Sequence, residues 1–302
     1  MKMQFRILFV VLLCSLFTKA SGCAFGIKLG HDSTRIASIQ SGKGRLEIVS
    51  SEEGKRYMPS LIGFRKGLPA FNTDAVSLLS RPGSLVFNSI PETFSPDMFL
   101  ANSVSTNGSV LKLDDESILR NCDLSTIFFS FLRETVSKHT EKDARDCVIT
   151  IPVHTSTSTR HAILQSAEAS GLRVLSLMEE DAAAALNYAS QANVESEQTY
   201  FLIDSGLTST TFSIFTITPN VKADNVEATQ VKMVSAKRFE KISGQAVNAL
   251  ILSDVLKSNK IENVEILSAK DQMLLSSEVE KLKKILTTYP TASFTVLLLF
   301  LD

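Results

Sequence analysis

The amino-acid sequence predicts an α/β protein built from two similar halves, and three features lead to this conclusion. A β-hairpin with a glycine turn is expected at residues 25–39, and a second hairpin of the same design at residues 200–217. Between them, residues 146–189 alternate short apolar strands with amphipathic helices. A chain of 302 residues, 44% of them hydrophobic, is large enough to bury the core of such a fold.

The chain begins with the charge and hydropathy pattern of a secretory signal peptide. Lys2 and Arg6 lie before or at the start of an apolar run at residues 7–17, and small residues follow at 20–22. We therefore expect residues 1–22 to be removed on export. The run is too short to give a stable membrane span. A signal anchor, a buried strand and a bacterial lipoprotein signal are the alternatives.

Each hairpin has a glycine turn that can approach an anionic ligand. An apolar strand leads to Gly30 in the first hairpin and to Gly206 in the second, with hydroxyl or acidic residues beside the glycine. Glycine lets the backbone come close to a ligand, and turn amides can point at an anion. The repeated pattern predicts a duplicated domain with a phosphate site between its halves. Two unrelated hairpins within one α/β domain are the alternative.

The stretch between the hairpins predicts two strand–helix units. Strands are expected at residues 146–151 and 172–178. The first helix starts near the hydroxyl residues 156–158 and ends at Gly171, because side-chain oxygens cap helix starts and glycine favours helix ends. The second helix, at residues 182–189, follows three consecutive acidic residues that suit the positive end of a helix dipole.

The remaining segments give weaker signals. Amphipathic helices are expected at residues 121–137, 245–256 and 276–286. The aromatic residues of the first of these helices share one face, which is typical of a core face. Residues 65–120 are rich in serine, asparagine, proline and aspartate, so loops and short elements are expected there.

The net charge argues against a nucleic-acid interface, and the cysteine spacing argues against a metal site built from cysteines. The net charge is −1, from 31 basic and 32 acidic residues, and a nucleic-acid interface would need a basic excess. The four cysteines lack the spacing of a metal site. Cys122 and Cys147 could pair as a disulfide in an oxidising compartment or remain buried free thiols, and both alternatives stay open.

Residues 146–189 hold an ordered set of motifs: a strand ending in Ile-Pro, a helix with an arginine, a Ser-Gly-Leu turn and an alanine-rich helix after a glutamate. The matching residues are Ile151, Pro152, Arg160, Ser170, Gly171, Leu172, Glu180, Ala183 to Leu186 and Tyr188. This order resembles the seventy-kilodalton heat-shock chaperone superfamily. Shorter matches at residues 56–64, 242–245 and 278–288 extend the resemblance. With the signal segment, the pattern is similar to that of a large lumenal branch of the superfamily.

The resemblance implies an α/β, actin-like ATPase fold of duplicated ribonuclease-H-like lobes, with an incomplete second lobe. It divides the chain into a signal peptide at 1–22, a first lobe at 23–198, a partial second lobe at 199–288 and an atypical apolar tail at 289–302. The tail departs from the superfamily pattern, as a truncated gene model or a splice product would. A buried terminal strand is the alternative.

The same resemblance implies a site for ATP or ADP, with Mg²⁺, between the lobes. The expected nucleotide contacts belong to the two turns and to a later glycine motif: Lys28, Gly30, His31, Asp32, Ser33, Gly206, Thr208 and Gly244. Glu180 and Asp204 are the expected catalytic carboxylates and magnesium ligands. Phosphoryl transfer depends on such positioning and charge compensation.

Three departures from the superfamily pattern bear on catalysis. Lys28 stands where the first turn usually has an aspartate, and Leu207 stands where the second turn usually has a glycine. Residues 85–105 give no convincing match to the catalytic lysine. Backbone amide donors tolerate side-chain changes, whereas metal-binding carboxylates do not. The sequence therefore predicts nucleotide binding with weak or lost hydrolysis, so that the chain is a degenerate ATPase at most.

Three functions follow from these expectations. The first is an ATP- or ADP-binding chaperone-type protein of the secretory pathway that acts on unfolded secretory proteins in the endoplasmic reticulum lumen, or after secretion. The second is a non-catalytic co-chaperone or nucleotide-exchange partner of another lumenal chaperone, which the altered first turn favours. The third is a sugar kinase of the actin-like fold, which would need a substrate carboxylate in the cleft.

Overall fold

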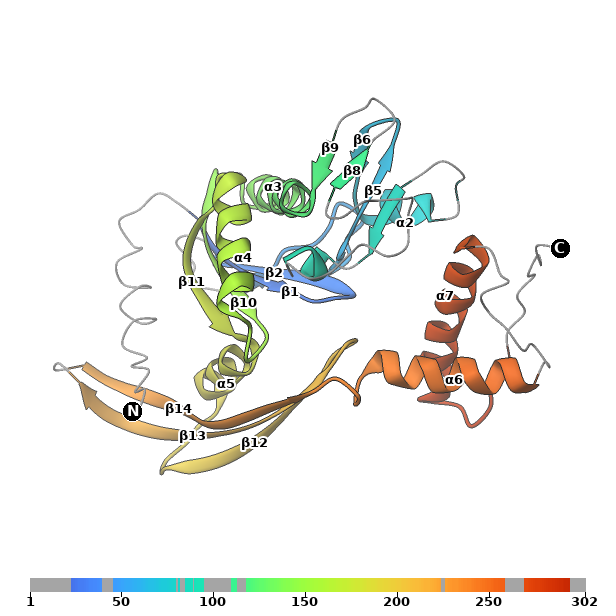
Figure 1. The fold of residues 1–302 in the computed structure, drawn as a ribbon. Helices are drawn as coiled ribbons and strands as arrows, with labels where there is room; N and C mark the ends of the chain where they lie inside the picture. Colours follow the sequence, from blue (N-terminus) through green and yellow to red (C-terminus); the bar gives the residue numbers. More distant parts are fainter. Residues whose placement is uncertain are drawn as a thin grey trace.

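The computed structural model of the protein describes residues 23–39, 46–79, 81, 85–88, 90–94, 110–112, 118–223, 226–258 and 269–293. The expected signal peptide at residues 1–22 and the last nine residues of the apolar tail lie outside these ranges. Figure 1 shows two main β-sheets with a helix, α5 (Glu180–Gln191), between them. No helix in the described ranges has the length and hydropathy that a membrane span requires.

The first sheet contains six strands and is built around the first hairpin. Its strands are β1 (Cys23–Leu29), β2 (Ser33–Ile39), β3 (Leu46–Ile48), β4 (Met58–Pro59), β10 (Ala144–Ile151) and β11 (Arg173–Glu179). The order is β11-β10-β1-β2-β3, and β4 pairs with β2. β1 and β2 are antiparallel, whereas β1, β10 and β11 run parallel. Alternate residues of β1 are buried, as the apolar pattern predicts.

Two helices cover this sheet. α3 (Asn121–Thr140) and α4 (Thr157–Ala169) pack against each other and against β10 and β11, respectively. Of the predicted apolar face of α3, Phe128 and Leu132 are fully buried, and Ile127 and Phe131 pack partly buried against the core, which confirms that this face belongs to the core. Of the predicted capping residues, Ser156 caps α4: its hydroxyl accepts a hydrogen bond from the Thr159 amide at 3.1 Å.

Short elements fill most of the described part of residues 65–120, as the sequence predicts. They comprise β5 (Leu61–Arg65), β6 (Leu68–Ala70), α2 (Asn72–Leu78), β7 (Leu85–Asn88), the 3₁₀ helix η2 (Ile90–Phe94), β8 (Val110–Lys112) and β9 (Ile118–Arg120). β6, β5 and β7 form a three-stranded sheet, and β8 pairs with β9. Ile62, Phe87 and Ile90 join these elements to the main core.

The second main sheet is antiparallel and extends beyond the predicted hairpin. Its strands are β12 (Gln198–Ser205), β13 (Thr210–Ala223) and β14 (Val226–Phe239), in the order β12-β13-β14. α5 packs on one face, where Ala185 meets Phe215, Ile217 and Val231. A buried hydrogen bond reinforces this contact, because Ser213 Oγ donates to Asp181 Oδ2 at 2.6 Å. The opposite face leaves Phe201 and Ile203 more than half exposed.

Two helices follow the second sheet. α6 (Gly244–Ser258) and α7 (Ala269–Leu286) pack on each other, and Figure 1 shows them at the end of the sheet that holds the β12–β13 turn. Both helices are longer than the sequence predicts. Val279 and Leu282 are buried on α7 as the sequence predicts, but Ile285 and Leu286, expected on the same core face, are each 42% exposed, so the prediction is wrong for the last turn of the helix.

Cys122 and Cys147 lie in different environments. Cys122 is exposed at the start of α3, whereas Cys147 is buried in β10, and both are free thiols. The alternative of a disulfide between them is therefore wrong for this structure. Burial raises the pKa of the Cys147 thiol to about 12, so it behaves as an inert core residue.

Gly171 provides a test of how α4 ends. Its φ is +83°, and a Cβ there would lie 2.6 Å from Nη1 of Arg133, which anchors α3 to the Ala144 carbonyl. We expect Gly171→Ala to lower the free energy of unfolding by about 2 kcal/mol, from left-handed backbone strain plus displacement of Arg133. The measurement is denaturant unfolding followed by circular dichroism.

Gly54→Ala is the matched control for this experiment. Gly54 also has a positive φ, +75°, but an added Cβ would meet no atom within 4 Å. The control should therefore lose only the backbone contribution, about 1 kcal/mol. Equal losses in the two variants would show that the contact with Arg133 contributes nothing.

Candidate functional site

The turn of the first hairpin depends on a glycine. Gly30 follows β1, and a Cβ on it would lie 2.6 Å from the Ser33 carbonyl oxygen, so no other residue fits without moving the backbone. The turn is held from behind, because the Ser60 amide donates to the Asp32 carbonyl at 3.0 Å. Thr34 and Ser60 also join their buried hydroxyls at 2.8 Å.

The turn of the second hairpin is fastened to the start of α6. Within the turn, the Gly206 amide donates to the Ser209 carbonyl at 2.8 Å. The Gly244 amide then donates to the Gly206 carbonyl at 3.0 Å, and the Gln245 amide donates to the Leu207 carbonyl at 2.8 Å. A Cβ on Gly244 would come within 3.4 Å of the Gly206 carbonyl oxygen. The first residue of α6 thus lies in van der Waals contact with the second turn.

The two turns lie against each other. Thr208 Oγ1 is 3.2 Å from His31 Nδ1, a hydrogen bond between residues 177 positions apart in the sequence. Close by, Lys28 Nζ of β1 is 3.6 Å from Asp204 Oδ2 of β12, and both side chains are about one-third exposed or more. In Figure 1 the two hairpins lie one above the other beside α5. The structure therefore brings four of the sequence-predicted site residues together.

Glu180 belongs to the same cluster of charges. It is the first residue of α5, directly after β11, and its side chain is only partly exposed. Burial raises the pKa of the Glu180 carboxyl, and the negative charges of Asp204 and Asp181 act in the same direction. The cations Lys28 and Arg238 oppose this rise. The Glu180 carboxyl therefore lies among two other carboxylates and two cations.

Arg238 is a site residue that the sequence does not predict. It lies at the end of β14, opposite Thr211, which in turn lies opposite Asp204, so the three residues form a row across the sheet. Its Nε is buried and, within the described ranges, has no hydrogen-bond partner. Burial lowers the pKa of His31, and the charge of Arg238 lowers it further. β14 itself gave no recognisable signal, so nothing in the sequence points to Arg238.

Two predicted contacts do not join the cluster. Asp32 is exposed at the tip of the first turn and makes no ion pair with any residue that the structure describes. Asp32 lies in the same turn as Lys28, at an exposed position where a carboxylate can reach a ligand. Ser33 begins β2 and pairs with Pro59 of β4 through the backbone. Neither residue contacts the second turn among the described hydrogen bonds.

The site does not fit a magnesium ion. Magnesium usually needs only one or two protein carboxylates beside the phosphates of a nucleotide, so the charges next to Asp204 and Glu180 decide whether the ion fits. The Asp204 carboxylate faces the Lys28 ammonium, and a divalent cation at Asp204 would be repelled by that ammonium. The expected roles of Glu180 and Asp204 as metal ligands thus conflict with the charges around them.

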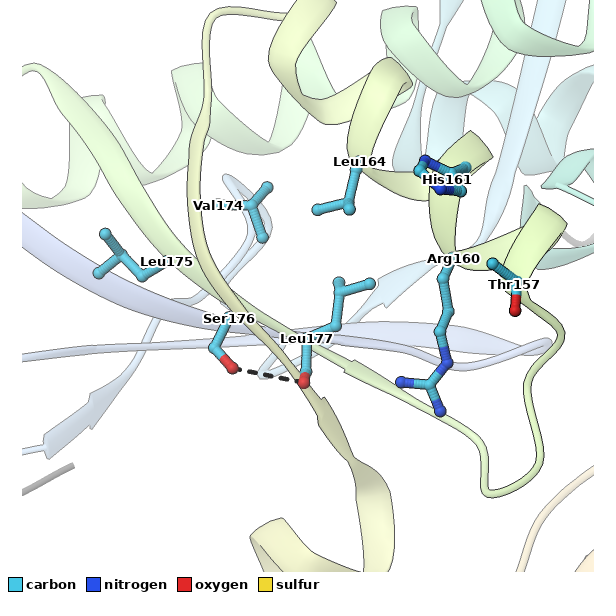
Figure 2. Close-up of a pocket in the computed structure, with 8 residues that line it drawn as sticks. All are labelled: Thr157, Arg160, His161, Leu164, Val174, Leu175, Ser176 and Leu177. Atoms are coloured by element: carbon cyan, nitrogen blue, oxygen red, sulfur yellow. Dashed lines mark hydrogen bonds between the residues drawn. The ribbon is translucent and has the colours of Figure 1, made fainter. Parts of the chain in front are cut away.

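A cavity elsewhere on the first sheet is apolar. It has a volume of about 420 Å³ and lies between α4 and β11. Figure 2 shows Leu164, Val174 and Leu177 gathered around it, while the Arg160 side chain extends away toward the strand end. Arg160 Nη2 lies 3.4 Å from Oε1 of Glu179. The cavity contains no residue of either glycine turn, and its apolar lining does not suit a phosphate.

Comparison with known proteins identifies the family. A family model of the Hsp70 protein matches residues 101–297, about two thirds of the chain. Hypoxia up-regulated protein 1 of Xenopus laevis is 24% identical over 183 residues, which cover 56% of this chain and 28% of that protein. The protein of the same name from Danio rerio is 23% identical over 292 residues, covering 88% of this chain and 29% of its own length.

A bacterial relative extends the comparison. Chaperone protein HscA homolog of Neisseria meningitidis is 23% identical over 279 residues, which cover 89% of this chain and 42% of that protein. The chain spans less than half the length of each of these three relatives. The family match, together with the paired glycine turns and the α/β architecture, shows that this chain belongs to the Hsp70 protein family and has its actin-like ATPase fold.

Proposed function

We propose that this chain is the nucleotide-binding part of a chaperone-type protein, and that it binds ATP or ADP but hydrolyses ATP slowly or not at all. The observation that carries the proposal is the contact between the two glycine turns, 3.2 Å from Thr208 Oγ1 to His31 Nδ1. Members of the Hsp70 family bind ATP or ADP between two lobes. In this chain the two glycine turns stand at the corresponding places in the sequence and face each other, which supports nucleotide binding here as well.

Phosphate binding is supported by the backbone of both turns. Glycines at positions 30, 206 and 244 allow close packing, and Gly206 leaves room on its outer side because an added Cβ would meet only the Ser209 carbonyl, at 3.4 Å. Turn amides bind anions without help from side chains. Lys28 adds a positive charge that is 41% exposed and therefore accessible to a ligand.

Weak hydrolysis is supported by the charges around the carboxylates. Transfer of a phosphoryl group needs charge compensation at the phosphates and a carboxylate that orients the attacking water. Here Lys28 forms an ion pair with Asp204, and the charges of Lys28 and Arg238 also act on Glu180, so a positive charge lies beside both carboxylates. Binding through backbone amides is unaffected by either change.

The domain organisation and cellular location are part of the same proposal. We propose a first lobe at residues 23–198 and a second lobe that starts at residue 199, with Glu180 and Asp204 on either side of the boundary. A signal peptide at residues 1–22 would direct the protein to the endoplasmic reticulum lumen. Its partners there would be unfolded secretory proteins or another lumenal chaperone.

A second candidate function is that of a non-catalytic partner that promotes nucleotide exchange on another chaperone. The ion pair between Lys28 and Asp204 favours it, because this contact occupies the carboxylate that a hydrolytic cycle needs. A protein that holds nucleotide without turning it over is not driven through conformational changes by hydrolysis. Such a protein can serve as a stable binding surface for a cycling partner.

Nucleotide binding can be tested at Gly206. We expect Gly206→Ala to fold, since its Cβ meets no atom closer than 3.4 Å, but to weaken ATP and ADP binding about tenfold by crowding the turn amides. Isothermal titration calorimetry measures the affinity. Gly26→Ala, within β1, is the control because a Cβ there meets nothing within 4 Å. Unchanged affinity in Gly206→Ala would place the nucleotide elsewhere.

Hydrolysis can be tested at Asp204. We expect no magnesium-dependent ATP turnover above background in the wild-type protein, and no difference between it and Asp204→Ala, because Lys28 already neutralises this carboxylate. A coupled phosphate-release assay measures the rate. Asp143→Ala, an exposed carboxylate that pairs with Arg133, serves as the control. A wild-type turnover that disappears only in Asp204→Ala would contradict weak hydrolysis.

The contact between the turns should depend on pH through His31. Burial and Arg238 lower its pKa below the ordinary 6.5, so the folded protein holds it neutral while the unfolded chain takes up a proton first. The stability from this site is complete above pH 6.5 and falls as the pH drops below that value. We expect the unfolding free energy of the wild-type protein to decrease more between pH 7.5 and pH 5 than that of His31→Asn.

Denaturant titrations at several pH values measure this difference. His139→Asn, at an exposed position near the end of α3, is the control and should follow the wild-type profile. Parallel profiles for the wild-type protein and His31→Asn would mean that protonation of His31 does not influence the contact.

A further inference from the structure

The candidate site contains two cations, Lys28 near the end of β1 and Arg238 near the end of β14. We propose that Lys28 and Arg238 together supply the charge compensation that a divalent cation would provide, so that the cleft binds the uncomplexed polyphosphate of ATP or ADP. This inference rests on the proposed nucleotide binding, and it specifies the form of the ligand. The reason is that the positive charges of the site would repel a magnesium ion.

Lys28 is placed where it can exchange the Asp204 carboxylate for a phosphate as its anionic partner. Its Nζ is 3.6 Å from Asp204 Oδ2, longer than a tight hydrogen-bonded ion pair, and both side chains remain partly exposed. An ion pair of this kind contributes little stability, so it can open at small cost when a more highly charged anion arrives. The ammonium has three donors, and phosphate oxygens can use those that Asp204 leaves free.

Arg238 approaches the same region from the far edge of the sheet. Asp204, Thr211 and Arg238 are directly opposite one another on β12, β13 and β14, so they lie on one face, the same face on which α5 packs. Paired strands are about 4.8 Å apart, which places the Arg238 backbone about 10 Å from that of Asp204. This span suits a polyphosphate that reaches from Lys28 toward Arg238.

The unsatisfied donor of Arg238 is a second, independent observation. Its Nε is buried without a hydrogen-bond partner in the described part of the chain. An unpaired buried donor on a charged group is unfavourable, and an anionic ligand that draws the guanidinium into contact would relieve this cost. An uncomplexed phosphate chain has the charge that matches two cations.

A bound magnesium ion would weaken the electrostatic attraction between the nucleotide and the two cations. A nucleotide that carries a divalent cation presents less negative charge, and it brings that cation toward Lys28 and Arg238. The nearby Asp204 carboxylate offsets this repulsion only in part, because Lys28 Nζ lies 3.6 Å from Asp204 Oδ2 and stays next to it when it turns toward a phosphate. The cleft should therefore prefer the nucleotide without its metal.

Calorimetric titration of the full chain with ATP, in excess EDTA and in excess magnesium, tests the inference. We expect the wild-type protein to bind ATP at least as tightly in EDTA as in magnesium. Lys28→Asp should lose affinity about tenfold or more in EDTA and bind better once magnesium is added, because it restores a carboxylate at the first turn. Arg238→Gln should weaken binding in EDTA without creating a magnesium preference.

Two controls complete the design. Lys232→Asp, at an exposed position in β14 remote from the turns, makes the same charge change and should keep the wild-type ratio of affinities. Circular dichroism checks each variant, and Lys28→Met replaces Lys28→Asp if the latter does not fold. Lys28→Met should bind weakly in EDTA and gain nothing from magnesium.

The outcomes separate this inference from the function on which it rests. Wild-type binding that requires magnesium would overturn the inference and leave nucleotide binding intact. The same holds if Lys28→Asp retains the wild-type affinity in EDTA. An absence of ATP and ADP binding in both conditions would instead refute the proposed function, and the inference with it.

Discussion

The buried hydrogen bond from Ser213 to Asp181 fixes the relation between the two main sheets, and the candidate site depends on it. Asp181 is the second residue of α5 and is 2% exposed, so its carboxylate must be satisfied inside the protein. Ser213 provides one donor at 2.6 Å, and the Ala182 amide provides another at 2.9 Å. The first turn of α5 is thereby held against β13.

Because Glu180 is the neighbour of Asp181, this anchor also sets the position of Glu180. β11 leads directly into α5, so the parallel strands of the first sheet and the antiparallel strands of the second meet at one short stretch of chain. The hairpin turns lie beside this junction. A contact such as that of Thr208 with His31 could not form if α5 slid along the second sheet.

The proposed function separates two requirements that nucleotide enzymes combine. Backbone amides and glycines would position a phosphate, and Gly244 and Gln245 fasten the second turn to α6. The proposed loss of hydrolysis depends instead on charge, because Lys28 lies beside Asp204. On this proposal the chain keeps the architecture of a nucleotide cleft while its charges disfavour a metal.

Local periodicity predicts much of this fold because it reports on neighbours in the sequence. The hairpins and both strand–helix units follow from apolar alternation, glycine and capping residues such as Ser156. β14 escapes prediction because one of its faces is exposed and its alternation is weak, so its assignment depends on pairing with β13. The short elements between residues 65 and 120 likewise depend on distant core contacts.

The candidate site divides in the same way. The glycine turns are visible in the sequence, and their resemblance to a family pattern suggests that they meet. The partner of Lys28 and the row from Asp204 to Arg238 are products of strand register, which no local pattern specifies. The same holds for the pKa of Glu180, whose rise comes mainly from burial in the assembled fold.

The uncovered face of the second sheet has a consequence for the behaviour of the chain in solution. Phe201 is 62% exposed and Ile203 is 57% exposed, and the Phe201 and Phe212 rings stack on each other on the side opposite α5. Contiguous apolar surface of this kind drives self-association. Exposed apolar surface is also the feature by which folding machinery recognises its clients. Because the face favours association, the thermal midpoint of the isolated chain should vary with its concentration.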